Sequence, residues 1–235
     1  KTDYLIDSFI DVALNNEYLS RQSGVRKWTK PIKYYFIHRT ADKALHERLS
    51  KLHLQHLESI TGLNIQQVNT KKSANLLIIF SKESLLANEL LTEFHIQSKK
   101  QRQHLVRSSV CLAHFTINKN SSIQKAIVII PVDRARAKAK LVSCIVEELT
   151  QIMGLPNDSG KVFPSIFNDR STNELLSGLD FILLKMLYHP ALQTGIQKKS
   201  IRPKLLAIIQ EFNKQKLISH AQTLVTKGGL YPLLY

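Results

Sequence analysis

The sequence predicts an α+β fold in which a β-sheet packs against helices and the chain ends in a helical part. Three features predict it: helical and strand-like segments alternate over the first half, one long helical pattern follows, and helical patterns and loops make up the rest. The chain has 235 residues, 43% of them hydrophobic, so it can bury one sizeable core. We expect a single domain over residues 1–235, with a helical N-terminal extension (1–29), the sheet with its main helix (30–158) and a helical C-terminal part (159–235).

The first half of the chain alternates between the two kinds of element. Residues 3–19 repeat apolar side chains at the i, i+3, i+4, i+7 spacing of an amphipathic helix, which we expect to end near Gly24. Further strands are expected where β-branched, aromatic or continuous apolar residues occur, and helices where leucines recur at helical spacing. The expected strands are 32–38, 63–70, 74–81, 109–117 and 125–131; the expected helices are 42–60, closed by Gly62, and 83–98, which a basic connection at 99–107 follows.

The second half is predicted to be helical. From Arg134 to Met153 the helical pattern is unbroken, Gly154 ends it, and Pro156 prevents it from resuming. Two more helices are expected, from about 173 to 188 and from Pro203 to about 216. The apolar stripe of the long helix consists of Leu141, Cys144, Ile145, Leu149 and Ile152.

This long helix carries the stretch CIVEELTQIMGLPND, Cys144 to Asp158. Its frame E-E-x-x-Q-x-x-G-x-x-N-D matches the H-E-x-x-H-x-x-G-x-x-H-D frame of zinc peptidases, in which the His residues hold the metal and the Glu activates water. The general-base Glu is kept as Glu148, and so is the closing Asp158. The three ligand positions hold Glu147, Gln151 and Asn157 instead of His.

On this frame and on two later segments, the sequence resembles the metzincin metallopeptidases, which have the zincin fold. Ser165–Asp169 (SIFND) resembles their Met-turn, with Phe167 in place of the Met, and 176–190 resembles their closing helix. The resemblance covers about residues 30–190 and is closest to a proteobacterial family of predicted lipoproteins whose function is not established. It implies a twisted mixed sheet with Val110–Phe115 as edge strand and Ala126–Ile130 as its inner neighbour, beside the active-site helix.

The replaced ligands argue against tight zinc binding. Zinc favours imidazole and thiolate, whereas Glu147, Gln151 and Asn157 offer oxygen ligands. Calcium binds oxygen ligands, but it normally coordinates six to eight of them. We therefore expect no cofactor, with zinc or calcium as the weaker alternative, and we expect the polar side chains to satisfy one another. The residues expected to line the cleft are Glu147, Glu148, Gln151, Asn157, Asp158 and Phe167.

The two cysteines and a histidine pair leave alternatives open. Cys111, in the expected edge strand, and Cys144, in the motif helix, are equally consistent with a disulfide and with two buried thiols. His53 and His56 have i, i+3 spacing on an expected helix but no third ligand follows, so we expect solvated surface residues rather than a metal site.

The net charge of the chain indicates which partners it binds, and its first residue bears on its location. Lys and Arg number 33 against 18 acids, a net charge of +15, which favours anionic partners. The basic stretches 99–107, 134–140 and 198–204 lack stacking aromatics, so nucleic acid is the less favoured partner. No apolar run reaches the roughly 18 to 20 residues of a membrane span. The chain starts at Lys1, which leaves open an upstream signal peptide or lipid anchor and association with a membrane through it.

These observations lead to one expected function and two alternatives. Metzincins hold substrate peptides as an added strand, and this mode of binding needs no metal. We expect a non-catalytic metzincin-like module of the bacterial cell envelope, periplasmic or anchored to the outer membrane, that binds a peptide or an anionic polymer. The alternatives are an active metal-dependent hydrolase with Glu148 as general base, and nucleic-acid binding through the basic stretches.

Overall fold

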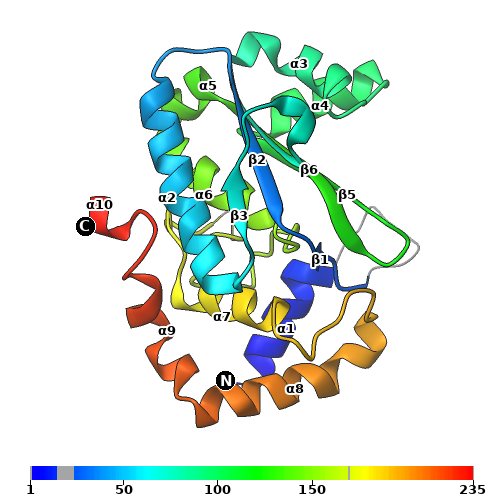
Figure 1. Cartoon of the computed structure of the whole chain (residues 1–235), viewed down its shortest axis with the longest axis vertical. Helices are drawn as coiled ribbons and strands as arrows, with labels where there is room; N and C mark the ends of the chain where they lie inside the picture. The colour runs from blue at the N-terminus through cyan, green and yellow to red at the C-terminus, as the bar shows by residue number, and fades with distance from the viewer. Residues whose placement is uncertain (1, 15–23, 169, 235) are drawn as a thin grey trace.

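A computed structural model describes residues 2–14, 24–168 and 170–234 and has a mixed α+β fold, as predicted (Figure 1). Its strands are β1 (Lys27–Trp28), β2 (Ile32–His38), β3 (Ile65–Gln67), β4 (Leu76–Ser81), β5 (Leu112–Ile117) and β6 (Ser122–Pro131). Its helices are α1 (Thr2–Leu14), α2 (Lys43–Thr61), α3 (Glu83–Thr92), α4 (Lys99–Ser108), α5 (Val132–Ala137), α6 (Leu141–Gln151), α7 (Gly178–Leu187), α8 (Lys198–Lys214), α9 (Leu217–Val225) and α10 (Tyr231–Leu234), with a 3-10 turn at Lys71–Ser73. No helix in the described ranges is long and apolar enough to cross a membrane.

The strands of the described residues form one sheet that is parallel except at one edge. The order β1-β6-β4-β2-β3 is parallel throughout, and β5 pairs antiparallel with β6. Residues Ala126 to Ile129 of β6 pair with β4 and with β5 at once, so these two neighbours lie on opposite sides of β6. The strand β5 is therefore an edge strand, the position that the metzincin resemblance implies for Val110–Phe115.

Helices cover both faces of the central strands. In β4, Ile78 and Phe80 belong to the main core with α2 and α6, whereas Ile79 packs with Leu86 and Leu90 of α3 in a separate cluster. Strands with two covered faces read as continuous apolar runs. The two covered faces explain why the continuous apolar run 74–81 predicts a buried strand. Figure 1 shows α3 and α4 at one end of the molecule and α1, α7 and α8 toward the other.

Two predicted boundaries are wrong because local capping and backbone geometry decide them. The stretch 99–107 is helix α4 rather than a connection, because Ser98 Oγ accepts from Gln101 N (3.3 Å) and caps the helix. The pattern from Arg134 to Met153 is two helices, α5 and α6, because the chain turns between them through Ala139, which has a positive φ of 52°.

The helical C-terminal part also begins its helices at other residues than predicted. Helix α7 starts at Gly178 rather than near 173, because Ser177 and Asp180 form a reciprocal capping box. Helix α8 starts at Lys198 and runs through Pro203, with Ile201 fully buried. The predicted helix 3–19 is described only as α1, because its last residues and the approach to Gly24 lie outside the described residues.

The prediction that His53 and His56 lie in solvent is wrong. Helix α2 packs against α6, and His53 Nε2 lies 3.0 Å from Thr150 Oγ1 on the motif helix. His56 is buried beneath Gly228 and Gly229 near the C-terminus. Burial lowers the pKa of His53 to about 3 and that of His56 to about 4. Both side chains are therefore neutral parts of the core.

Candidate functional site

A cleft of about 340 Å³ lies between the edge strand β5 and the motif helix α6. One wall is the segment from Ser108 to Ala113, which leads into β5 and forms its first residues. The opposite wall is α6 with the residue before it, and Asp158 comes from the loop after it. The lining side chains of this second wall are Lys140, Ser143, Cys144, Glu147, Glu148, Gln151 and Asp158.

Helix α6 is held by its apolar stripe and by contacts at its C-terminal end. Ile145, Leu149 and Ile152 are fully buried, which turns the polar face of the helix toward the cleft. The last carbonyl groups of a helix lack partners within the helix. Here Trp28 Nε1 donates to Ile152 O (2.8 Å) and Tyr188 Oη donates to Met153 O (2.8 Å). Neither hydrogen bond follows from a local sequence pattern.

Gly154 lets the chain leave this helix end. Its φ is +118°, and a Cβ there would lie 2.0 Å from the carbonyl oxygen of Arg26. Only glycine combines this backbone conformation with so close an approach. The glycine of the motif is therefore required by packing in this chain, independently of any metal.

Glu148 is the most unusual side chain of the cleft. It is only 7% exposed, yet it lines the cleft and makes no hydrogen bond or ion pair within the described part of the chain. Burial raises the pKa of Glu148 well above its ordinary value, and the negative charges of Glu147 and Asp158 raise it further. The carboxyl thus holds its proton more strongly than an exposed glutamate does.

The three zinc-ligand positions of the motif do not converge. Gln151 Nε2 donates to Asp158 Oδ1 (3.0 Å) at the cleft. Asn157 turns away from it: its backbone N–H and its Nδ2 both donate to Val12 O of α1, at 3.1 and 2.9 Å. Glu147 stays at the cleft. Asn157 thus satisfies a terminal carbonyl of α1 and, contrary to expectation, does not line the cleft.

These residues do not fit zinc. They supply amide and carboxylate oxygens, and two of the three are engaged elsewhere. Within residues 2–14, 24–168 and 170–234, no group of three or more His, Cys, Asp or Glu side chains is arranged to hold a metal ion.

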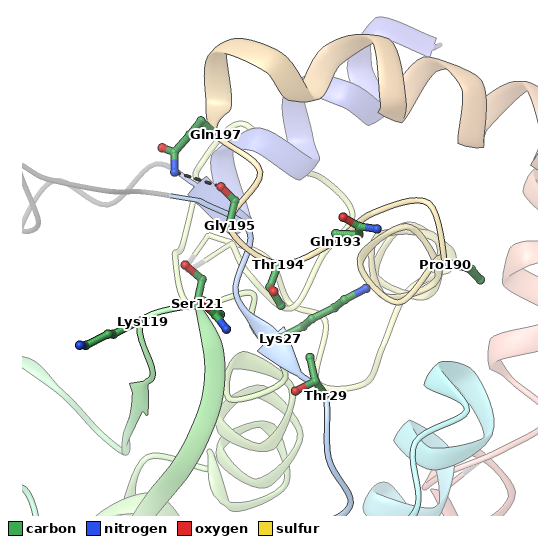
Figure 2. Close-up of a pocket in the computed structure, with 10 residues that line it drawn as sticks. Lys27, Thr29, Lys119, Ser121, Pro190, Gln193, Thr194, Gly195 and Gln197 are labelled. Atoms are coloured by element: carbon green, nitrogen blue, oxygen red, sulfur yellow. Dashed lines mark hydrogen bonds between the residues drawn. The ribbon is translucent and has the colours of Figure 1, made fainter.

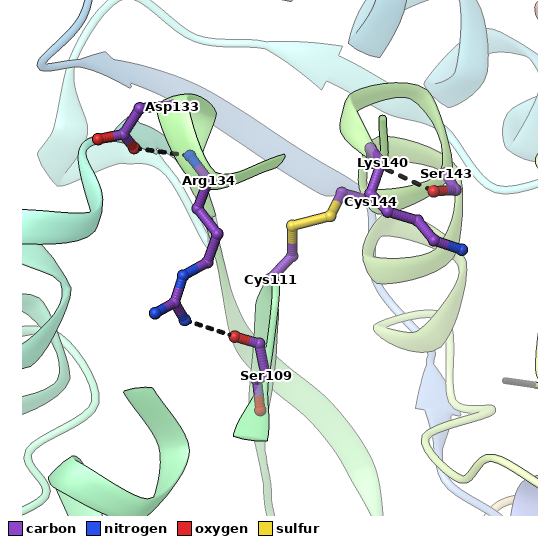
Figure 3. The surroundings of a disulfide bond; sticks show 7 residues. All are labelled: Ser109, Cys111, Asp133, Arg134, Lys140, Ser143 and Cys144. Atoms are coloured by element: carbon purple, nitrogen blue, oxygen red, sulfur yellow. Dashed lines mark hydrogen bonds between the residues drawn. A yellow bond between two sulfur atoms is a disulfide. The ribbon is translucent and has the colours of Figure 1, made fainter. Parts of the chain in front are cut away.

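Cys111 and Cys144 form a disulfide with a Cα–Cα distance of 5.9 Å, which decides between the two alternatives left open by the sequence. Figure 3 shows the bond joining the residue before β5 to α6, so that it crosses from one cleft wall to the other. Arg134 holds the same segment by donating to the carbonyl of Ser109 (2.8 Å) and to that of Val106. The strand edge and the motif helix are therefore fixed relative to each other.

None of the described residues of the segment that resembles the Met-turn lines the cleft. Phe167 is fully buried and is not part of the cleft lining, contrary to expectation; Asp169 lies outside the described residues. Asp180 organises the segment, accepting from Ser165 Oγ (2.6 Å) and from Ile166 N (3.2 Å). Burial raises the pKa of Asp180 to about 6, against the opposing effect of these hydrogen bonds.

A second cavity, of about 670 Å³, lies between the β5–β6 turn and the segment before α8 (Figure 2). Its lining is polar, but neither of its two lysines presents an unpartnered charge to the cavity as Glu148 does to the cleft. Lys27 Nζ already donates to the carbonyls of Leu187 (3.0 Å) and Leu192 (2.6 Å), and Lys119 extends away from the other lining side chains. The smaller cleft at α6 is therefore the better candidate site.

The model of a family described as "Protein of unknown function (DUF2927)" matches residues 2–207. No curated protein is similar enough to the chain to count as a match.

Proposed function

Given that the chain belongs to the DUF2927 family of proteins of unknown function, we propose that it is a non-catalytic, metzincin-like module of the bacterial cell envelope that binds an extended peptide. The peptide adds to the outer edge of β5 and places side chains in the cleft against α6. The zincin fold itself is part of this proposal, supported by the order of the motif segments and by the antiparallel edge strand beside the motif helix.

The observation that carries the proposal is the position of β5. Within the described residues no strand pairs with its outer edge, and the cleft begins at its first residues. An unpaired edge presents main-chain donors and acceptors to which an extended peptide can add as a new strand. With about 3.3 Å per residue, the six residues of β5 offer an edge roughly 20 Å long, enough for a peptide of about six residues.

The disulfide supports the location that we propose. Disulfides persist in oxidising compartments such as the bacterial periplasm. The bond between Cys111 and Cys144 also holds the two walls of the peptide site at a fixed separation. We therefore place the module in the periplasm or at the outer membrane, held there by an upstream lipid anchor if the precursor carries one.

The test is selection from a random library of linear peptides, followed by hydrogen exchange of the backbone amides. Selected peptides should protect the amides of β5. Ala113→Trp places a large side chain in the cleft and should abolish binding. Thr116→Trp changes an exposed position on the other face of the strand and should not abolish it. Selection of no peptide, or protection elsewhere on the surface with β5 unchanged, would show that the proposal is wrong.

An active hydrolase is the second candidate, and Glu148 is the reason to retain it. A buried carboxyl with a strongly raised pKa in a cleft is typical of catalytic acids and bases. Selected peptides incubated with the protein, with and without zinc or calcium, should remain intact. Hydrolysis that Glu148→Gln abolishes would favour the hydrolase instead.

Nucleic-acid binding has less support, because the three basic stretches do not form one track: 99–107 and 134–140 are in contact through Arg134, but 198–204 lies apart from them. Figure 1 shows α4 and α8 at opposite ends of the molecule. Several of the cations are already paired with acids: Arg134 with Glu83, Arg136 with Asp42, and Arg202 with Asp3 and Asp7. A phosphate backbone requires cations along one continuous track. An anionic envelope polymer would need the same kind of track, so we favour a peptide.

A further inference from the structure

The cleft wall formed by α6 and the loop after it is acidic, although the protein is strongly basic. Glu147, Glu148 and Asp158 line it together, whereas the whole chain has 33 basic against 18 acidic residues. The wall formed by Ser108 to Ala113 contributes no titratable side chain, since Cys111 is in the disulfide. Lys140, at the start of α6, is the one cation among the described lining residues. Carboxyls therefore outnumber cations three to one among the described residues that line the cleft.

Glu148 points to a missing partner. Buried polar groups are almost always hydrogen-bonded, and a buried carboxyl without a partner is costly. The Glu148 side chain is only 7% exposed, its carboxyl opens to the cleft, and it has no hydrogen-bond or ion-pair partner within the described chain. A ligand that donates hydrogen bonds to it, and preferably carries positive charge, would remove this cost.

The arrangement favours an extended cation over a metal ion. The three acids are not grouped so that they could hold a metal. A guanidinium group spreads its charge over a planar fork with five donors and can contact carboxylates that do not converge on one point. An ammonium group is a more compact charge, so it fits this arrangement less well.

Resting on the proposed peptide binding, we propose that the cleft selects peptides with one basic side chain, foremost arginine, whose guanidinium contacts Glu148. Long-range repulsion by the net charge of +15 and the presence of Lys140 disfavour a second basic residue. The rest of the peptide is therefore neutral or acidic. The binding energy divides into main-chain hydrogen bonds to β5 and one charge-assisted contact at α6.

The test uses synthetic libraries of blocked hexapeptides with random uncharged residues around one fixed residue. That residue is arginine, lysine, citrulline or norleucine. Citrulline has nearly the shape of arginine without its charge, and charge-assisted hydrogen bonds are worth more than neutral ones. We expect the arginine library to bind about tenfold or more tightly than the citrulline library.

Glu148→Gln should abolish the preference for the arginine library over the citrulline library. Glu174→Gln is the matched control, because Glu174 is exposed and does not line the cleft, and the same charge is lost. The affinity of the wild type for arginine peptides should also rise with pH through the raised pKa of Glu148 and then level off, because the guanidinium binds the carboxylate form. Thermal melting checks that both variants fold.

Three outcomes separate the inference from the function on which it rests. Loss of the arginine preference in Glu148→Gln alone supports the inference. Peptide binding at β5 with no arginine preference, or with a preference that Glu148→Gln keeps, overturns the inference and leaves the proposed function intact. If none of the four libraries binds, both are wrong.

Discussion

At the residue scale, Asn157 and Gly154 show that motif positions can be kept for packing. In a zinc peptidase the position of Asn157 would hold the metal, but here its amide satisfies a terminal carbonyl of α1. Gly154 has a positive φ and its Cα approaches the backbone of Arg26. Both residues join the motif loop to other parts of the chain, so their roles are structural rather than chemical.

We predict that Gly154→Ala destabilises the protein by about 3 kcal/mol or more, because the methyl group meets a backbone carbonyl and the φ of +118° is strained for an L-residue. Urea denaturation followed by circular dichroism measures the change. Gly160→Ala is the control, since its Cβ would meet nothing within 4 Å. Equal stability of the two variants would contradict the packing role of Gly154.

At the element scale, α2 owes its position to buried histidines as well as to leucines. His46, His53 and His56 all lie on its buried side, and His53 contacts Thr150 of α6. Burial lowers the pKa of each one; for His46 the positive charge of Arg136 adds to the effect. The packing of α2 on the motif helix thus depends on neutral imidazoles.

We predict that acid weakens the fold through His53 and His56. In the unfolded chain each titrates near 6.5, in the folded chain at about 3 and about 4, so stability falls as pH drops below about 6.5. Between its unfolded and folded pKa values, each histidine lowers the free energy of unfolding by about 1.4 kcal/mol for each unit that the pH falls. Asp180 and Glu148, whose pKa values are raised, act in the opposite direction.

The measurement is urea denaturation of the wild type and of the double variant His53→Gln/His56→Gln between pH 7 and 5. The difference in stability between the two proteins isolates the histidines from the acids, and it should shrink as pH falls. The exposed His104→Gln should leave the pH dependence as it is in the wild type. A difference that is constant across this range would contradict the prediction.

At the scale of the whole molecule, α1 packs the start of the chain against the C-terminal helices α7 and α8 and into the main core. It packs against α7 and α8, it is held by Asn157, and Phe9 and Val12 are fully buried in the main core. Asp3 and Asp7 on its exposed side pair with Arg202 of α8. The helix is therefore packed into the same core as the sheet and the C-terminal part.

We predict that Phe9→Ala costs about 3–5 kcal/mol, as for other aromatic truncations in a core, and that it unfolds the molecule in one transition. Thermal unfolding followed by near- and far-UV circular dichroism tests this. Asp7→Ala, on the exposed side of the same helix, should change little because exposed ion pairs are weak. A separate early transition of Phe9→Ala would instead show that α1 is an independent extension.

Residue patterns alone determined the α+β class, the strands at β2, β4, β5 and β6, and the helix with the EELTQ motif, because hydrophobic periodicity and helix-stop residues act locally. The tertiary structure alone decided which motif residues meet at the cleft. Asn157 and Phe167 leave it, His53 and His56 enter the core, and Glu148 is buried without a partner. These outcomes depend on contacts between α1, α2 and α6, which are distant in the chain, and no local pattern encodes such contacts.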